Sequence, residues 1–210
     1  MNKNIEPIIT LIKSSSEKSL RNKDYVEALI RAFGITFEYR AAYGYDNKFM
    51  NPGGVTGIYQ TPRQLAEFLV HMSKFSIKSY LEVGVFQGGN YLFTTTYLRM
   101  FNPFMTSVAL DITTEFMQSD MKDLVFITKG TTKELMGQRF DLVFIDGDHQ
   151  YESVKEDFMN VGQYAKYCAF HDINDDTCPG PVRFWKQINH LYPTKEFTYH
   201  SEGRQVHGIG

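Results

Sequence analysis

Residues 79–90, SYLEVGVFQGGN, decide the fold class of this chain. A short run that suits a buried strand passes directly into a glycine-rich turn, and a segment that suits the first turn of a helix follows it. Residues 140–149, FDLVFIDGDH, repeat the order of an apolar run, a carboxylate and a glycine. Strands that end in this way and lead into helices are the repeating units of a parallel sheet.

The same alternation of strand and helix continues through the rest of the chain. Apolar runs predict five buried strands, SYLEVG, TSVALDI, DLVFIT, FDLVFID and YCAFHDI, while EFTYH and QVHGIG predict two more. Helices are expected near residues 89–101, 113–121, 131–137, 150–163 and 181–191. Because near-continuous apolar strands are typical of parallel sheets, the pattern predicts an α/β fold with a mostly parallel seven-stranded sheet and helices on both faces.

The first 60 residues have a different character. Short apolar groups predict helices in residues 1–40, and residues 41–60, rich in glycine and tyrosine, predict a loop. Thr61-Pro62 then predicts a helix start, because threonine caps helices and proline fits their first turn.

The composition excludes several classes of protein. The 210 residues carry 22 Lys+Arg and 24 Asp+Glu, a formal charge of −2, so the chain lacks the basic footprint of a nucleic-acid-binding protein. Its two cysteines, Cys168 and Cys178, form no C-x-x-C pair, which argues against a disulfide framework and a cysteine-based zinc site. With no signal peptide and no apolar run of about 18 residues, we expect a cytoplasmic protein without a membrane partner.

Polar side chains stand where the predicted strands end. Because the carboxyl ends of parallel strands meet at one edge of a sheet, and ligands bind at that edge, these side chains predict a ligand cleft. They are Glu82, Asp111, Asp146, Asp148, His149, His171 and Asp172.

The glycine-rich turn fits two nucleotide-binding motifs poorly. A dinucleotide fingerprint needs a glycine where Phe86 stands, at the point where a pyrophosphate approaches the backbone. A P-loop needs a lysine where Asn90 stands.

Together these segments resemble a known family. The pattern E-V-G-x-x-x-G-G at 82–89, then Asp111, FDLVFIDGDHQYESVKEDF, FHDI and PGPVRFW, is similar to class I S-adenosylmethionine-dependent methyltransferases. More narrowly it resembles the small-molecule O-methyltransferases that include macrocin O-methyltransferase and the cephalosporin hydroxylase-like proteins. The resemblance implies a Rossmann-like sheet in an S-adenosylmethionine-binding domain at residues 58–210, preceded by a helical extension and lid loop at residues 1–57.

The resemblance also implies cofactor-binding residues. Glu82, Gly84 and Gly88 would shape the pocket for the methionine part of S-adenosylmethionine, and Asp111 would hold its ribose. The adenine would lie near Gly130 and Thr131. Gln60 would help to close the pocket, and Asp146 would face both the cofactor and the catalytic groups.

In metal-dependent relatives a divalent cation, magnesium or manganese, is bound at positions that correspond to Asp146, His171 and Asp172, and His149 would be the general base. Relatives carry an acidic residue where this chain has His171. Because magnesium prefers oxygen ligands, a softer metal, a site without metal, and completion of the shell by Asp148 or Asp175 all stay open.

The sequence therefore predicts methyl transfer from S-adenosylmethionine to a hydroxyl of a small molecule, a sugar or a natural product. A hydroxyl is a weak nucleophile, so a base such as His149, acting beside Asp146, is chemically reasonable. Two alternatives stay open: a cofactor-binding protein of the same fold without turnover, and an NAD-dependent dehydrogenase. Assembly into a homo-oligomer is also left open.

Other polar residues receive structural interpretations. We expect Asp148 to cap the helix near residue 150, and the acidic and basic residues at 152–157 to form a solvated helix face. No motif surrounds His71, His190, His200 or His207, so no role is assigned to them.

Overall fold

The structure is a computed structural model that describes residues 5–34, 58–117, 121–201 and 204–210. The described residues form two compact units. The first takes its residues from Met1–Ile77, Phe86–Met105 and Glu115–Phe126, and the second from Lys78–Val85, Thr106–Thr114 and Ile127–Gly210. Most of the expected lid loop lies outside the described residues, so the division at residue 57 stays a prediction.

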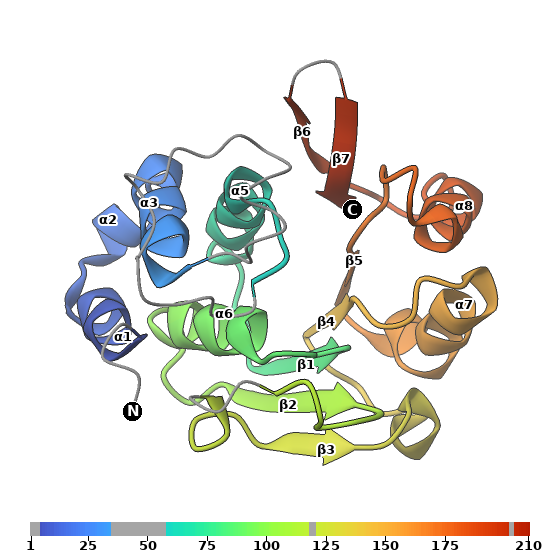
Figure 1. Cartoon of the computed structure of the whole chain (residues 1–210), viewed down its shortest axis with the longest axis horizontal. Coiled ribbons are helices and arrows are strands. Elements are labelled where there is room, and N and C mark those ends of the chain that lie inside the picture. Colours follow the sequence, from blue (N-terminus) through green and yellow to red (C-terminus); the bar gives the residue numbers. More distant parts are fainter. Residues whose placement is uncertain (1–4, 35–57, 118–120, 202–203) are drawn as a thin grey trace. The chain divides into compact units, whose positions relative to one another are not determined.

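The second unit is built on a parallel sheet (Figure 1). Its strands are β1 (Ser79–Val83), β2 (Thr106–Asp111), β3 (Ile127–Lys129), β4 (Leu142–Ile145) and β5 (Tyr167–Phe170), in the order β3-β2-β1-β4-β5. Because all neighbouring pairs are parallel, the ends of β1, β2, β4 and β5 that carry polar residues lie at the same edge. The predicted parallel α/β sheet is confirmed.

The prediction of seven strands in one sheet is wrong. The sheet has five strands, and β6 (Phe197–Ser201) and β7 (Arg204–Ile209) form a separate antiparallel pair. This pair meets the end of β5 through the isolated bridge between His171 and Ile209 and two hydrogen bonds between Phe170 and Gly210, and the N–H groups of Ile173 and Asn174 donate to the carbonyl oxygens of Gly208 and His207. His207 and Gly208 have φ values of 56° and 98°, which depart from the extended backbone that a longer ladder needs.

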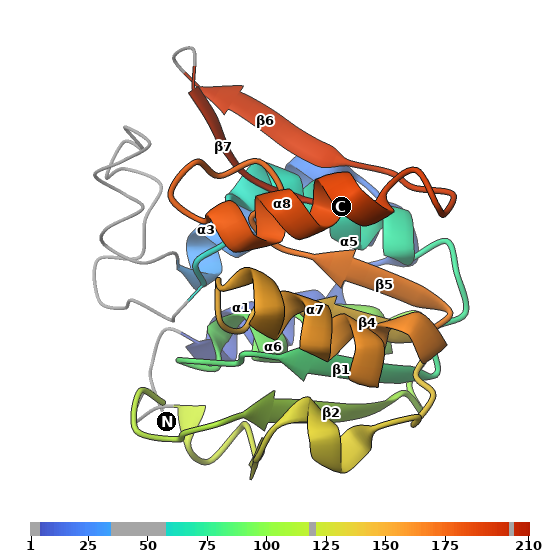
Figure 2. The same cartoon turned by 90° about the vertical axis from the view of Figure 1, so that its right-hand side faces the viewer.

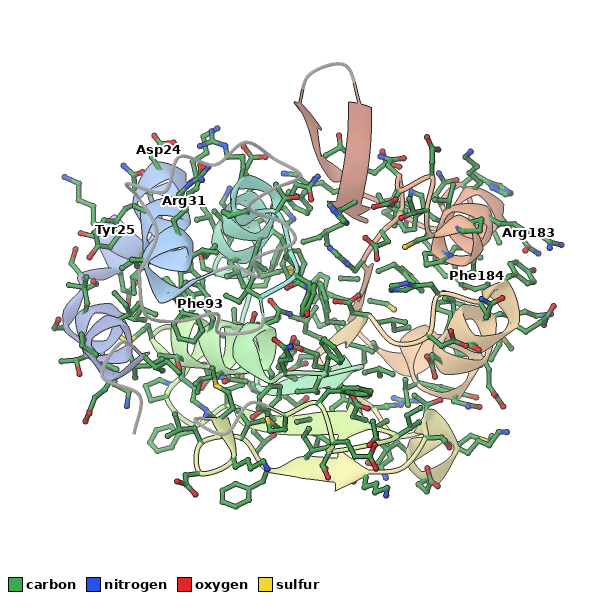
Figure 3. All side chains as sticks on the ribbon, in the orientation of Figure 1. Asp24, Tyr25, Arg31, Phe93, Arg183 and Phe184 are labelled. Atoms are coloured by element: carbon green, nitrogen blue, oxygen red, sulfur yellow. The ribbon has the colours of Figure 1, made fainter. Side chains whose placement is uncertain are left out.

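One face of the sheet packs against α7 (Tyr151–Asn160) and α8 (Pro179–Ile188) (Figure 2). Alternate strand residues meet apolar residues of both helices in one buried core, as the two-residue period of a strand requires. The core includes Leu81, Val83, Leu110, Val143, Ile145, Val154, Phe158, Phe170, Phe184 and Trp185. Arg183 and Phe184 extend from α8 (Figure 3), where the guanidinium lies 4.1 Å from the Tyr151 ring and Phe184 contacts Phe158. Coverage of the second face by helices stays a prediction.

The first unit consists of helices: α1 (Ile5–Ser14), α2 (Glu17–Leu20), α3 (Lys23–Phe33), α5 (Pro62–Met72) and α6 (Gly89–Arg99). The rings of Phe93 from α6 and Phe33 from α3 pack edge to face, with their centroids 5.4 Å apart. The Tyr97 hydroxyl donates to the carbonyl oxygen of Leu20 at 2.6 Å. Figure 3 labels Asp24, Tyr25 and Arg31 on α3 of this unit. The helices predicted in residues 1–40 are confirmed for residues 5–34, the rest of that range lying outside the described residues, and the helix start at Thr61-Pro62 is confirmed as well.

Two expected helices differ from the structure. Residues 113–117 of the predicted 113–121 helix are not helical, because the Asp111 carboxylate accepts the Thr113 N–H and turns the chain. The predicted 131–137 helix is a short 3₁₀ helix, η3 (Thr132–Leu135), and Gly137 follows with a φ of 77°. None of the helices in the described part of the chain has both the length and the apolar character needed to cross a membrane.

Candidate functional site

The second unit contains most of the residues that the sequence predicted as a site. Strands β1 and β2 themselves carry Glu82 and Asp111. The turns after β1, β3, β4 and β5 supply Gly84, Gly130, Thr131, Asp146, His149, His171 and Asp172. Gln60 and Gly88 belong to the first unit, and their part in a shared pocket stays a prediction.

Gly84 joins the turn after β1 to the turn after β4. Its N–H donates to the carbonyl oxygen of Leu110 at 2.9 Å, and the N–H of Asp146 donates to the carbonyl oxygen of Val83 at 2.9 Å. A Cβ on Gly84 would lie 2.1 Å from the Asp146 carbonyl oxygen, and φ is 84°. Only glycine fits this backbone, so the turn holds Asp146 against the end of β1.

Glu82 and Asp111 are held on neighbouring strands. Glu82 is 1% exposed and accepts a hydrogen bond from the Tyr80 hydroxyl. Asp111 accepts the N–H of Val85 at 3.0 Å and of Thr113 at 3.1 Å, one on each carboxylate oxygen. Asp111 therefore shapes two loops, and because a carboxylate has about four acceptor positions it can still accept a ligand hydroxyl.

Gly130 and Thr131 follow β3. Thr131 caps η3: its N–H and its hydroxyl donate to Glu134 at 2.7 and 3.0 Å. The backbone N–H of Thr131 lowers the pKa of Glu134. Thr131 has a clear structural role, and a contact with adenine is an additional expectation.

Three histidines and three aspartates gather after β4, after β5 and in β7. We call this the histidine–aspartate cluster: Asp146, His149, His171, Asp172, Asp175 and His207. Nδ1 of His171 lies 3.1 Å from Oδ1 of Asp146 and 3.2 Å from Oδ2 of Asp172. On the other side of Asp172, Nδ1 of His207 lies 2.7 Å from Oδ1.

Opposite charges dominate this buried cluster. Burial by itself would lower the pKa of His171, but the carboxylates of Asp146 and Asp172 raise it well above its ordinary value. Burial would raise the pKa of Asp172, but His171 and His207 lower it. Asp172 is therefore an anion shared by several imidazoles.

His149 is the exposed member of the cluster. Its side chain is 46% exposed, with Nε2 3.3 Å from Oδ2 of Asp172 and Nδ1 3.4 Å from Sγ of Cys178. Burial raises the pKa of Cys178 to about 12, so this neighbour is a neutral thiol. A Cβ on Gly180 would lie 2.2 Å from the His149 carbonyl oxygen, so the start of α8 packs directly on this loop.

Several candidate residues were missed by sequence reasoning. His207 reaches the cluster through the β6–β7 pair, and no local motif marks it. In the first unit, the Asn90 amide and the Thr94 hydroxyl are buried on α6 without hydrogen-bond partners among the described residues. Such groups suit contact with a ligand, and the glycine pair before Asn90 was the only available signal.

The interpretations of Asp148 and Asp157 need correction. Asp148 accepts from the Ser153 hydroxyl at 2.7 Å, while Gln150 is the N-cap residue of α7. Asp157 was expected on a solvated face, but it is largely buried and accepts from the Thr132 hydroxyl at 2.8 Å. Burial raises the pKa of Asp157 to about 6.

The Asp157 pKa predicts a pH-dependent effect on stability. A raised folded-state pKa favours folding below the ordinary value near 4, and that contribution is lost as the pH rises through about 6. The free energy of unfolding of Asp157→Asn, relative to that of wild type, should therefore rise by about 2–3 kcal/mol when the pH is raised from 4 to 7.5. Urea unfolding at both pH values measures this change, and Glu152→Gln, at an exposed position on the same helix, is the control. The same difference between Asp157→Asn and wild type at both pH values would contradict the prediction.

A comparison with protein families matches residues 81–173 to a model described as a methyltransferase domain. A search of curated protein sequences returned no match.

Solved structures share the fold. The O-methyltransferase from Bacillus cereus in complex with SAH is 14% identical, with a TM-score of 0.53 over 98% of this chain and 94% of that one. TomG from Streptomyces achromogenes, an O-methyltransferase involved in tomaymycin synthesis, is 12% identical, with a TM-score of 0.53 over 100% of this chain and 97% of that one. CalS11, a TDP-rhamnose 3′-O-methyltransferase of calicheamicin biosynthesis, is 16% identical, with a TM-score of 0.51 over 93% of this chain and 94% of that one.

At these identities the structural likeness shows the Rossmann-like fold, and the family match supplies the activity. The predicted resemblance is confirmed. Residues 81–173 therefore match a methyltransferase domain, the chain shares the Rossmann-like fold of solved O-methyltransferases, and the two findings together support S-adenosylmethionine-dependent methyl transfer as its activity.

Proposed function

We propose that this methyltransferase acts on a hydroxyl oxygen of a small molecule. The observation that carries the proposal is His149, an imidazole that is half exposed and lies 3.3 Å from the buried carboxylate of Asp172. An imidazole held by a carboxylate at a strand end is suited to take a proton from an alcohol. The O-methyltransferases of tomaymycin and calicheamicin biosynthesis support a natural product or a sugar as the acceptor class.

Bound S-adenosylmethionine supplies an electrophilic methyl group on a sulfonium sulfur. In our proposal Glu82 and Gly84 shape the space for its methionine part, Asp111 accepts from the ribose, and Gly130 and Thr131 face the adenine. The resemblance also assigns Gln60 and Gly88, which belong to the first unit, to the cofactor. Gln60 is 2% exposed, and Gly88 is the N-cap residue of α6 with a φ of 92°.

His149 is the proposed general base. Asp172 holds a proton on Nε2, which leaves Nδ1 as the accepting nitrogen; the acceptor hydroxyl takes the place of the Cys178 thiol, 3.4 Å away, and gives its proton to Nδ1. The oxygen forms the new bond to carbon as the carbon–sulfur bond breaks, which leaves S-adenosylhomocysteine, the methyl ether and a protonated imidazole. Asp146 borders the reaction centre and keeps the neighbouring His171 in place through the 3.1 Å contact. Positioning of the acceptor supplies much of the remaining rate.

Magnesium fits this donor set poorly. Asp146 and Asp172 provide oxygen ligands, but the Nδ1 atom of His171 lies between them. Magnesium requires a nearly all-oxygen shell, whereas manganese and later metals accept imidazole more readily. No step of the proposed reaction depends on a metal.

The role of His149 predicts a specific loss of turnover. His149→Gln removes the base and should lower methyl transfer by roughly 10²–10⁴-fold, while affinity for S-adenosylhomocysteine stays within about twofold. Transfer of a radiolabelled methyl group to a panel of sugars and natural-product alcohols measures turnover, and calorimetry measures affinity.

The matched control is His190→Gln, which changes an exposed histidine after α8. Full activity of His149→Gln would contradict the role. Wild-type protein that binds the cofactor but methylates no member of the panel would favour the alternative without turnover.

A further inference from the structure

The inner part of the histidine–aspartate cluster is rich in both charge and nitrogen donors. The side chains of His171, Asp172, Asp175 and His207 are 2%, 5%, 8% and 9% exposed, and that of Asp146 is 14% exposed. Three carboxylates in so little solvent need compensating positive charge, which protonated imidazoles or a bound cation can supply, because buried charges are stable only when paired or bound to a cation. A divalent cation would offset two of these charges.

The spacing of the donor atoms suits a single ion. One ligand atom each from His171, Asp172 and His207 lies within 4.8 Å of the other two. Donors about 2.0–2.2 Å from one cation are roughly 3 Å apart when adjacent and just over 4 Å apart when opposite. The contact of 3.2 Å between His171 and Asp172 agrees with adjacent positions.

Two further features mark this group of residues. Nε2 of His171 is buried without a hydrogen-bond partner among the described residues, so the contacts of Nδ1 with Asp146 and Asp172 leave one nitrogen of this ring unsatisfied. Asp172 and His207 also have φ values of 58° and 56°, a left-handed backbone that non-glycine residues adopt at a cost. Local strain of this kind is found where the fold fixes functional side chains.

From this arrangement we infer that His171, Asp172 and His207 bind a divalent first-row transition-metal ion such as Zn²⁺, and that magnesium is not the preferred ion. Two imidazoles and one carboxylate form a donor set typical of zinc and non-haem iron sites, and imidazole nitrogen selects such ions over magnesium. His207 is thus a metal ligand supplied by the β6–β7 pair. Asp175, 3.2 Å from Nδ1 of His207, orients that ring.

The test uses full-length protein stripped of metal with a chelator. Calorimetric titration with ZnCl₂ and with MgCl₂ should show one Zn²⁺ site per chain that binds at least about 100-fold more tightly than Mg²⁺. Titration with Co²⁺ should give the visible absorption bands of an ion with nitrogen ligands. Equal or tighter binding of Mg²⁺ would overturn the inference, whatever the behaviour of the variants.

His207→Asn tests the new ligand. Asparagine tolerates the left-handed backbone at this position, and it places an amide group, a much weaker zinc ligand than imidazole nitrogen, where Nδ1 of His207 stood. We expect Zn²⁺ affinity to fall at least about tenfold, while the control His190→Asn leaves it unchanged. Unaltered affinity in a folded His207→Asn protein would remove His207 from the ligand set. If that variant does not fold, the Zn²⁺ to Mg²⁺ comparison on wild type decides the question.

The inference and the proposed function can fail separately. Titration of the metal-free protein with S-adenosylhomocysteine reports on the cofactor site alone. Cofactor binding without preferential Zn²⁺ binding refutes only the metal inference, and Zn²⁺ binding without cofactor binding refutes only the proposed function.

Discussion

Gly84→Ala is expected to unfold the turn after β1 and to abolish cofactor binding. The added Cβ would lie 2.1 Å from the Asp146 carbonyl oxygen and 2.5 Å from the Gly147 Cα atom, both of them backbone atoms that cannot rotate away. The backbone at Gly84 also has a φ of 84°. Overlap and backbone strain each cost about 1–3 kcal/mol, so we expect a loss of at least about 3 kcal/mol in the free energy of unfolding.

Gly137→Ala is a matched control for this change. Gly137 has a φ of 77°, but a Cβ there would meet no atom within 4 Å. It therefore reports backbone strain alone, about 1–2 kcal/mol. Urea unfolding of both variants separates the two effects. Equal losses for Gly84→Ala and Gly137→Ala would show that the contact between the turns after β1 and β4 is less tight than described.

Asp111→Ala should weaken binding of S-adenosylhomocysteine by roughly 10- to 150-fold, equivalent to about 1.5–3 kcal/mol. The change removes the carboxylate proposed to accept from the ribose. It also removes the acceptors for the N–H groups of Val85 and Thr113, which shape the loops at this edge of the sheet. Calorimetry on the folded variant gives the change in affinity.

Asp141→Ala controls for the structural part of that loss. Oδ2 of Asp141 accepts the Lys78 N–H at 2.6 Å, but this residue precedes β4, at the opposite end of the strands. Asp141→Ala should lower stability without lowering cofactor affinity. A similar loss of affinity in both variants would mean that Asp111 acts only through the fold.

Sequence alone predicted those features that depend on local pattern. Alternating apolar runs gave the parallel strands, and the rule that parallel strands end at one edge brought Asp146, His171 and Asp172 to one place. The tight turn at Gly84 was also expected from its motif. These features follow from short-range order in the chain.

Other features depend on long-range pairing that no local pattern encodes. His207 joins Asp172 because the β6–β7 pair meets the end of β5, so a histidine without a motif becomes part of the cluster. The same pair lies outside the five-stranded sheet and has left-handed backbone at His207 and Gly208, two features that the strand pattern could not reveal. Asp157 was misplaced because its burial depends on Thr132 in a separate 3₁₀ helix.

Titration of the wild-type chain with S-adenosylmethionine, S-adenosylhomocysteine and NAD⁺ tests the central claim most directly. We expect saturable one-to-one binding of both sulfur compounds. We expect no binding of NAD⁺, because Phe86 occupies the position where a dinucleotide fingerprint needs glycine. Tight binding of NAD⁺ with no affinity for either sulfur compound would contradict the account and revive the dehydrogenase alternative.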